Sequence, residues 1–239
     1  MELLKYIILG IIQGLTEPLP ISSSGHLVLI KNLFNTNMLT DVNFEIVVNF
    51  GSFIAILIIF WKDIIKLITA FFGFIFKKEK RKQYHADFKY CLLIIIGSIP
   101  VGIAGLLFKD KVDEFSGNMT LLGIAFLITA IMLFLVKSAK GKKEDHDITY
   151  KDAIIIGLLQ MVALTPGISR SGTVLVGCLF CGLSRKASLK YTFMLYFPVS
   201  VGSMGLGLID MIQDNSLATL WLPYLCGLIA AGIVTYFSY

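Results

Sequence analysis

The chain contains few charged residues for its length. Asp, Glu, Lys and Arg account for 15% of its 239 residues, whereas they account for about 25% of a soluble domain. Hydrophobic residues make up 56% of the chain, and its mean hydropathy is +0.80. This composition excludes a soluble globular enzyme and predicts an integral membrane protein.

Cysteine and histidine are also scarce, with four and three residues. Cys178 and Cys181 form a C-x-x-C motif in an apolar run without histidine or carboxylate neighbours, so we interpret them as helix-packing residues. The net charge of +5 lies mostly in loops. There it indicates membrane topology, and no nucleic-acid partner is expected.

Five apolar runs are each about long enough to cross a hydrocarbon core of roughly 30 Å. They cover residues 44–61, 90–108, 119–136, 191–209 and 217–239. A further run at 62–76 carries three charged residues and predicts an interfacial helix. No linker separates a soluble module, so the sequence predicts a single all-α membrane domain over residues 1–239 with about five full transmembrane helices.

Two pairs of apolar runs are only half as long. Residues 3–12 and 25–34 flank a Pro/Ser-rich loop, and residues 153–164 and 172–183 flank a Pro/Gly/Ser-rich loop. A ten-residue helix is about 15 Å long, so none of these runs can span alone. Each pair predicts a re-entrant helical hairpin whose tip reaches the middle of the bilayer, where irregular backbone must line a polar cavity or be buried in protein.

The basic residues predict that the two hairpins enter from opposite faces. The loop at 77–89 has six Lys/Arg against two acidic residues, which places it in the cytoplasm. Counting spans from this loop puts the base of the first hairpin outside. The second hairpin ends at Ser184-Arg185-Lys186 and therefore enters from the cytoplasm.

The sequences of the two hairpins also resemble each other. LGIIQ at 9–13 corresponds to IGLLQ at 156–160, and ISSSG at 21–25 to ISRSG at 168–172, at one offset of 147 residues. Gly51-Ser52 recurs as Gly202-Ser203 at a slightly larger offset. These features predict an inverted-topology repeat with its site at the repeat interface. Repeat 1 covers about 1–136 and repeat 2 about 150–239, which lacks its last helix because the chain stops at Tyr239.

Arg170 is the strongest candidate for a functional residue. An arginine in the bilayer interior is costly unless it is paired or hydrated, and its guanidinium suits phosphate. The start of the second helix of this hairpin is a suitable anion site, and its expected substrate-binding residues are Ser169, Ser171, Gly172 and Thr173. The alternative is a structural ion pair of Arg170 with Glu17 or Glu45.

The first tip supplies the other candidate catalytic residues. Glu17 could act as a general base, orient a histidine or hold a divalent cation, or it could be a structural partner of Arg170. His26 is suited to proton transfer or to nucleophilic attack on phosphorus. Ser23 corresponds to Arg170 across the repeat and is our candidate nucleophile. The expected substrate-binding residues here are Gln13, Thr16, Ser22 and Ser24.

Both motifs resemble those of the undecaprenyl-diphosphatase family, the bacterial bacitracin-resistance membrane phosphatases. The family pattern (E/Q)GxTExLPxSSxGH is matched from Gln13 to His26, and PGxSRSGAT is matched from Pro166 to Gly172. Residues 44–52 and 194–202 also resemble the family. Three departures are visible: Gln13 stands where many members have glutamate, Thr173-Val174 replaces Ala-Thr, and the last helix of the family is missing beyond Tyr239.

The resemblance implies an enzyme that hydrolyses undecaprenyl diphosphate to undecaprenyl phosphate and inorganic phosphate. This reaction recycles the lipid carrier for peptidoglycan synthesis. The implied setting is multi-pass in the bacterial plasma membrane, with membrane lipid and the isoprenoid diphosphate as partners. A homodimer is also among the expected assemblies. We further expect Mg²⁺ or Ca²⁺ as a cofactor with Glu17 as a ligand, and an active site that opens to the outer face.

Three mechanisms remain open at this point. Ser23 attacks with His26 handling its proton and Glu17 orienting His26 or a cation, or His26 attacks, or Glu17 activates water. The rival function is an isoprenoid-phosphate transporter or flippase, because opposed re-entrant hairpins are also a transporter plan. A transporter needs the anion site but no nucleophile, so Ser23 and His26 favour the enzyme.

Overall fold

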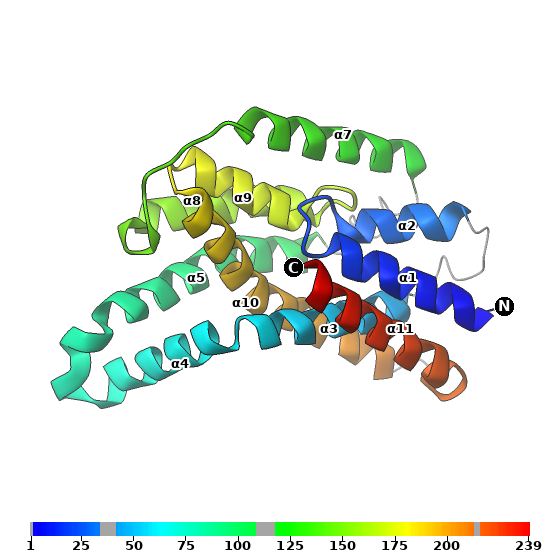
Figure 1. Ribbon diagram of the computed structural model, residues 1–239, viewed down its shortest axis with the longest axis horizontal. Helices are drawn as coiled ribbons and strands as arrows, with labels where there is room; N and C mark the ends of the chain where they lie inside the picture. Colours follow the sequence, from blue (N-terminus) through cyan, green and yellow to red (C-terminus); the bar gives the residue numbers. More distant parts are fainter. Residues whose placement is uncertain (1, 34–41, 109–117, 213–215) are drawn as a thin grey trace.

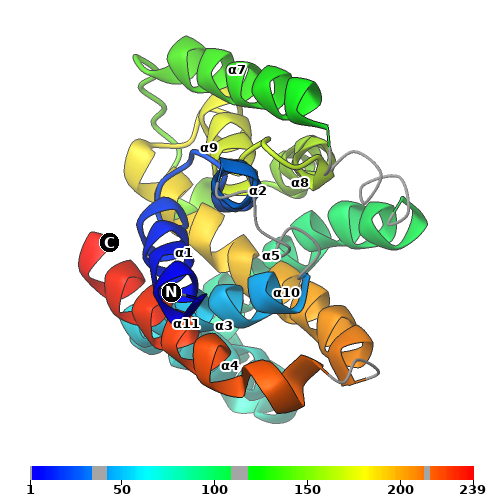
Figure 2. The same ribbon diagram turned by 90° about the vertical axis from the view of Figure 1, so that its right-hand side faces the viewer.

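The computed structural model describes residues 2–33, 42–108, 118–212 and 216–239. All named elements in these ranges are helices, which confirms the predicted all-α membrane protein (Figures 1 and 2). The α-helices are α1 (Glu2–Thr16), α2 (Ser23–Leu33), α3 (Val42–Ile59), α4 (Trp61–Phe76), α5 (Arg81–Leu107), α7 (Met119–Val136), α8 (Tyr150–Gln160), α9 (Arg170–Phe180), α10 (Arg185–Ile212) and α11 (Ser216–Ser238).

Within the described ranges, α5, α7, α10 and α11 are long and apolar enough to cross a membrane. A fifth span results if α3 and α4 are counted together, although the chain bends by 77° between them. The predicted run at 44–61 therefore corresponds to α3. The run at 62–76 forms α4, which turns away and packs along α5 through the rings of Phe74 and Phe88, whose centroids are 4.0 Å apart.

The four half-length runs form two helical hairpins, α1–α2 and α8–α9. Helix α1 has 15 residues and the other three have 11 each, so their helical lengths are about 16 to 23 Å at 1.5 Å per residue. Pro18 and Pro20 follow the end of α1, since proline cannot continue the helical hydrogen bonds. After α8, a short 3₁₀ turn (Met161–Leu164) leads into Pro166-Gly167.

The two hairpins enter from opposite ends of the molecule and their tips meet near its centre (Figure 1). The tips touch backbone to backbone, because a Cβ atom on Gly25 would lie 2.8 Å from the Cα of Gly167. Likewise, a Cβ atom on Gly172 would lie 3.0 Å from the carbonyl oxygen of Pro20. Gly167 also has φ +91°, a conformation that favours glycine. The predicted meeting of opposed hairpins is thereby confirmed.

Helices α1, α3 and α11 pack tightly beside the first hairpin. Tyr6, Phe44 and Tyr224, one from each helix, form an aromatic cluster with ring centroids 4.7 to 5.9 Å apart. Gly10 lies against the backbone of Gly227 with no space for a side chain. Small residues at such crossings let helices approach closely in membranes. This group holds α1 at a fixed position and so fixes the first tip.

The basic loops gather at the opposite end of the molecule from the N-terminus (Figure 1). Arg185, at the start of α10, donates to the carbonyl of Lys137 after α7. Lys89 of α5 donates to the carbonyl of His146 at 3.3 Å, just before α8. The base of the second hairpin therefore lies with the basic start of α5, as the predicted topology requires. The predicted loops at 35–43 and 109–118 fall almost wholly outside the described residues.

Candidate active site

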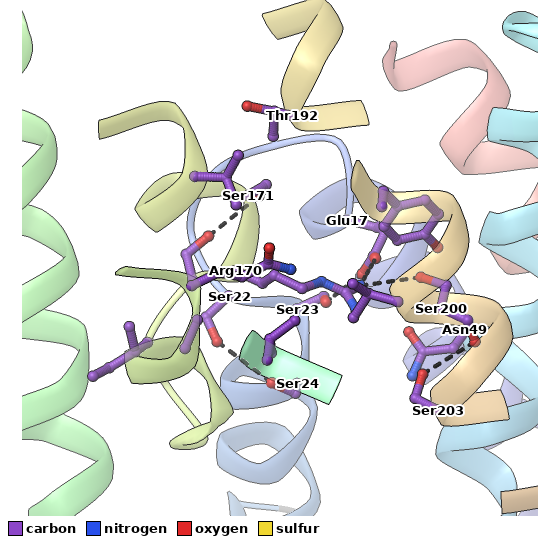
Figure 3. Close-up of a pocket in the computed structure, with 18 of the residues that line it drawn as sticks. Glu17, Ser22, Ser23, Ser24, Asn49, Arg170, Ser171, Thr192, Ser200 and Ser203 are labelled. Atoms are coloured by element: carbon purple, nitrogen blue, oxygen red, sulfur yellow. Dashed lines mark hydrogen bonds and ion pairs between the residues drawn. The ribbon is translucent and has the colours of Figure 1, made fainter. Parts of the chain in front are cut away.

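A cavity of about 270 Å³ lies where the two hairpin tips meet α3 and α10 (Figure 3). Polar side chains from both hairpins (α1, α2, α8 and α9 with their tips), from α3 and from α10 line it. The polar residues that line it are Thr16, Glu17, Ser22, Ser23, Ser24, Asn49, Gln160, Ser169, Arg170, Ser171, Thr192, Ser200 and Ser203. Eight of the predicted site residues are in this set, and Gln13, His26, Gly172 and Thr173 are not.

Glu17 is the central acidic group of the first tip and is buried. Its Oε2 accepts a short hydrogen bond from the Oγ of Ser23. The same oxygen accepts from the Nε2 of Gln13 at 2.9 Å, and this Nε2 also lies 2.8 Å from the Oδ1 of Asn49 on α3. Gln13 therefore fixes the carboxylate rather than facing the cavity itself. The carboxylate in turn holds the Ser23 hydroxyl.

Ser22 turns the chain into α2 and has φ +69°. A non-glycine residue in this region is strained, and such strain is often found at functional sites. The Oγ of Ser22 accepts from the amide of Gly25 at 3.3 Å, which caps the helix. Its carbonyl accepts from the amide of His26 at 3.2 Å. The cap and this bond together hold Ser23 and Ser24 at the first turn, facing the cavity.

His26 is not among the residues that line the cavity. Its Nδ1 is 2.8 Å from the carbonyl of Ser22, so Nδ1 donates and Nε2 is left as an acceptor in the neutral ring. The ring packs against Phe126 of α7, with centroids 5.0 Å apart. The hydroxyl of Ser23 is bonded to Glu17 instead. The geometry thus pairs the candidate nucleophile with Glu17 rather than with His26.

Ser169 caps α9 in the same way that Ser22 caps α2. Its Oγ accepts from the amide of Gly172 at 3.0 Å, and its carbonyl accepts from the amide of Thr173 at 2.8 Å. We expected both amides to face an anion, but each already has a partner within the turn. The amides of Arg170 and Ser171, the first two residues of the helix, remain as the donors that a helix start offers to an anion.

Arg170 reaches from α9 across to the first tip (Figure 3). Its Nη2 lies 3.6 Å from the Oε1 of Glu17 and 3.4 Å from the Oγ of Ser200. Its guanidinium carbon lies 4.9 Å from the ring centroid of Tyr196. Both polar contacts are long, and the side chain, which lines the cavity, is 31% exposed. The guanidinium is therefore close to Glu17 and able to bind a further anion.

The alternative ion pair of Arg170 with Glu45 does not form. Glu45 instead accepts from the Nζ of Lys31 at 2.8 Å. The Lys31 side chain is 2% exposed, although it lies in an apolar run where we did not expect a buried cation. This ion pair joins α2 to α3 near the base of the first hairpin, outside the cavity lining.

Sequence reasoning missed the residues that α10 contributes. Tyr196, Thr192, Ser200 and Ser203 line the cavity beside Arg170. A signal was available, because the recurrence of Gly51-Ser52 as Gly202-Ser203 makes Ser200 the counterpart of Asn49. Gln160, the counterpart of Gln13, was also noted only as part of a repeat.

A divalent cation would have a limited set of ligands from the protein itself. Among the described residues there is no group of three or more His, Cys, Asp or Glu side chains placed to hold a metal. Glu17 is the carboxylate that faces the cavity, and the Oε1 of the neighbouring Gln13 has no partner among the described residues. Mg²⁺ commonly binds with one or two carboxylates, several waters and the phosphates of a substrate. The residues present fit that kind of site.

Comparison with known proteins agrees with the motifs. The chain is 42% identical to the undecaprenyl-diphosphatase of Oceanobacillus iheyensis over 99% of this chain and 86% of the relative. It is 43% identical to undecaprenyl-diphosphatase 1 of Bacillus licheniformis, over 99% of this chain and 87% of that protein. Undecaprenyl-diphosphatase 1 of Halalkalibacterium halodurans is 38% identical, with 99% and 85% covered. The family model for bacitracin resistance protein BacA matches residues 6–239, and the chain belongs to this family.

Proposed function

We propose that this membrane protein hydrolyses undecaprenyl diphosphate to undecaprenyl phosphate and inorganic phosphate. The main support is the cavity in which Arg170 of one hairpin meets Glu17 and Ser23 of the other. A cation suited to phosphate thus lies beside an activated hydroxyl. The names of the relatives and the family support the same reaction, which recycles the lipid carrier for cell-wall synthesis and confers bacitracin resistance.

Ser23 is the proposed nucleophile, and Glu17 is its base. Glu17 removes the hydroxyl proton as Oγ attacks the terminal phosphorus. The bond from this phosphorus to the bridging oxygen breaks, and undecaprenyl phosphate leaves with the electron pair and receives the proton from Glu17. Water then attacks the phosphoserine and gives its proton to Glu17. Phosphate leaves as Ser23 recovers its proton from Glu17.

Arg170 and the first amides of α9 bind the terminal phosphate. Their charge and dipoles stabilise the negative charge on the phosphoryl oxygens during transfer. The two polar contacts of Arg170 are long, and its other donors, which have no hydrogen-bond partner in the part of the chain that the structure describes, can turn toward this group. A bound Mg²⁺ or Ca²⁺ near Glu17 would neutralise further charge on the diphosphate.

The apolar part of the cavity wall suits an amphiphilic substrate. Val101, Phe193, Val199 and Met204 line it from α5 and α10, so the polar head can enter while the isoprenoid tail stays among apolar groups and lipid. A transporter or flippase would need the same anion site. It is not favoured, because it does not require a serine hydroxyl held by a buried carboxylate.

Purified protein in detergent should release phosphate from undecaprenyl diphosphate when Mg²⁺ or Ca²⁺ is present. Arg170→Ala should lower the rate by about 10²- to 10³-fold, the effect of removing one group that stabilises transition-state charge. Each protein should first be shown to be monodisperse and to unfold near the same temperature. No release by folded wild-type protein would overturn the proposed function.

We also propose that phosphate leaves on the outer face. The basic loops lie together at the opposite end from the base of the first hairpin, and basic loops favour the cytoplasm. In sealed right-side-out membrane vesicles, phosphate should appear in the outer medium before lysis. If it appeared only after lysis, this orientation would be wrong.

A further inference from the structure

Gln160 is the last residue of α8 and lines the cavity together with Arg170. It is 1% exposed to solvent. Neither its Nε2 nor its Oε1 has a hydrogen-bond partner among the described residues. A buried side-chain amide with both polar groups unpaired is rare in folded proteins, and each such group needs an explanation.

The corresponding residue of the first hairpin shows what such a glutamine can do when partners are present. Gln13 is also fully buried, but its Nε2 donates to Glu17 at 2.9 Å and to Asn49 at 2.8 Å. Its role is internal, because it fixes the catalytic carboxylate.

The second hairpin has no equivalent partners. The repeat offset that aligns Gln160 with Gln13 places Leu164 at the position of Glu17. Leucine offers no acceptor. In α10, the larger offset that relates Gly51-Ser52 to Gly202-Ser203 places Ser200 at the position of Asn49. Ser200 accepts a hydrogen bond from Arg170. Gln160 therefore has the same side chain as Gln13 but lacks hydrogen-bond partners equivalent to Glu17 and Asn49.

Leaving an amide unpaired in a buried site is destabilising, and an apolar residue of similar size would remove that cost. The unpaired amide also lines the cavity where we propose that the diphosphate binds. A phosphoryl oxygen there would accept from Nε2. A water or a protonated phosphate oxygen would donate to Oε1.

We propose that Gln160 binds the substrate directly, with its Nε2 donating to a phosphoryl oxygen of the lipid diphosphate. This inference rests on the proposed function, since it names a further substrate contact of the same site. Gln160 adds a neutral donor to the cavity that Arg170 also lines with its charged guanidinium. Because this donor is neutral, it can bind a phosphoryl oxygen without repelling a cation that is bound to the same diphosphate.

The test compares Gln160→Met with Gln13→Met, two substitutions of similar shape at equivalent positions. Phosphate release from undecaprenyl diphosphate gives kcat/KM, and thermal unfolding in detergent gives Tm. Unfolding is repeated with a non-hydrolysable lipid diphosphate whose bridging oxygen is replaced by CH₂. Gln160→Met should lower kcat/KM by about 10- to 100-fold, as expected for a lost hydrogen bond to a charged group. It should keep or raise Tm and should lose most of the stabilisation by the analogue.

Gln13→Met serves as the matched control for a structural role. It removes the two hydrogen bonds of Nε2 and should lower Tm in the absence of ligand. If Gln160→Met lowered Tm in the same way and kept the full stabilisation by the analogue, Gln160 would be structural and the inference would be wrong. Wild-type kcat/KM in Gln160→Met would also overturn it, since the amide would then hold only internal water.

The outcomes also separate this inference from the proposed function. Suppose that wild-type protein released no phosphate but was stabilised by the analogue, and that Gln160→Met abolished this stabilisation. The proposed hydrolase function would then be overturned, whereas the proposed contact between Gln160 and the lipid diphosphate would be supported. If the analogue stabilised neither protein and no phosphate was released, both proposals would be overturned.

Discussion

The two hairpin tips share the same serine cap but carry different chemistry. Ser22 and Ser169 each cap a helix through the amide three residues later, at 3.3 and 3.0 Å. Each is also paired with the serine two residues later, with Oγ atoms 3.5 and 3.3 Å apart. Between these serines, one tip carries Ser23 and the other carries Arg170. The same frame thus presents a hydroxyl on one side of the cavity and a cation on the other.

The residues next to these side chains also differ between the two hairpins. The first hairpin has Glu17 to bind the hydroxyl, and the second has Leu164 at the equivalent position. A second carboxylate there would lie in the same cavity as Arg170 and compete with phosphate for it. In the proposed mechanism, this asymmetry keeps the base on one hairpin and the anion-binding groups on the other. The two tips thus share a serine cap, and a few different side chains account for the proposed reaction.

The largest expected effect comes from breaking the first tip at Ser23. Ser23→Ala should lower phosphate release by at least about 10³-fold, because the attacking hydroxyl is lost while Arg170 and the α9 amides remain. Ser24→Ala is the matched control, since Ser24 lines the same cavity but its hydroxyl contacts Ser22 instead of Glu17. This change removes at most one neutral hydrogen bond to the substrate and should lower the rate by about tenfold or less.

Trapping experiments test the same assignment. Acid quenching during turnover should leave phosphate on Ser23. Phosphate on His26 would instead identify the histidine as the nucleophile. Phosphate on neither side chain, with Ser23→Ala still active, would favour attack by water with Glu17 as base.

Much of this comparison could be predicted from the sequence. The lengths of the apolar runs and the prolines determined the half-helices, because a ten-residue helix cannot cross a bilayer and proline cannot continue one. The offset of 147 residues then identified the pairs Ser22–Ser169 and Ser23–Arg170. Those pairs occupy equivalent positions in the structure because in both loops a serine caps the following helix through its third amide.

The side-chain partners could not be predicted in the same way. His26 lies only three residues after Ser23, but on a helix that spacing does not decide which of two groups a hydroxyl will bind. The bend that brings Glu17 to Ser23 depends on the φ of +69° at Ser22, which no residue preference indicated. Tyr196 and Ser200 come from a distant apolar span, where serine and tyrosine have many other uses. Their position depends on how α10 crosses the tips.

A smaller effect is expected from separating the two tips. Gly25→Ala would place a methyl group 2.8 Å from the Cα of Gly167, a backbone atom that cannot turn aside. It should destabilise the protein by about 1–3 kcal/mol and lower activity, since the hydroxyl and the guanidinium would move apart. Thermal unfolding and phosphate release measure the two effects.

Gly123→Ala on α7 is the control for this change. A Cβ atom there meets nothing within 4 Å, so alanine should stabilise the helix by about 0.5–1 kcal/mol and leave activity unchanged. If both substitutions raised stability equally, the tips would not be in close contact.

The smallest expected effect comes from substituting the two capping serines, Ser22 and Ser169. Ser169 has φ −71° and Ser22 has φ +69°, although both accept a hydrogen bond from the third amide of their helix. Alanine at either position removes the cap and should cost about 1 kcal/mol. Glycine also removes the hydroxyl, but at position 22 it relieves a left-handed conformation that costs other residues about 1–2 kcal/mol.

Ser22→Gly should therefore be at least as stable as wild type, whereas Ser169→Gly should be slightly less stable than wild type. The difference in unfolding free energy between alanine and glycine should be about 2 kcal/mol at position 22. At position 169 it should be about 1 kcal/mol or less. Equal differences at the two positions would mean that the first tip carries no extra strain. A larger difference at 22 would show that the first tip carries backbone strain that the second tip lacks.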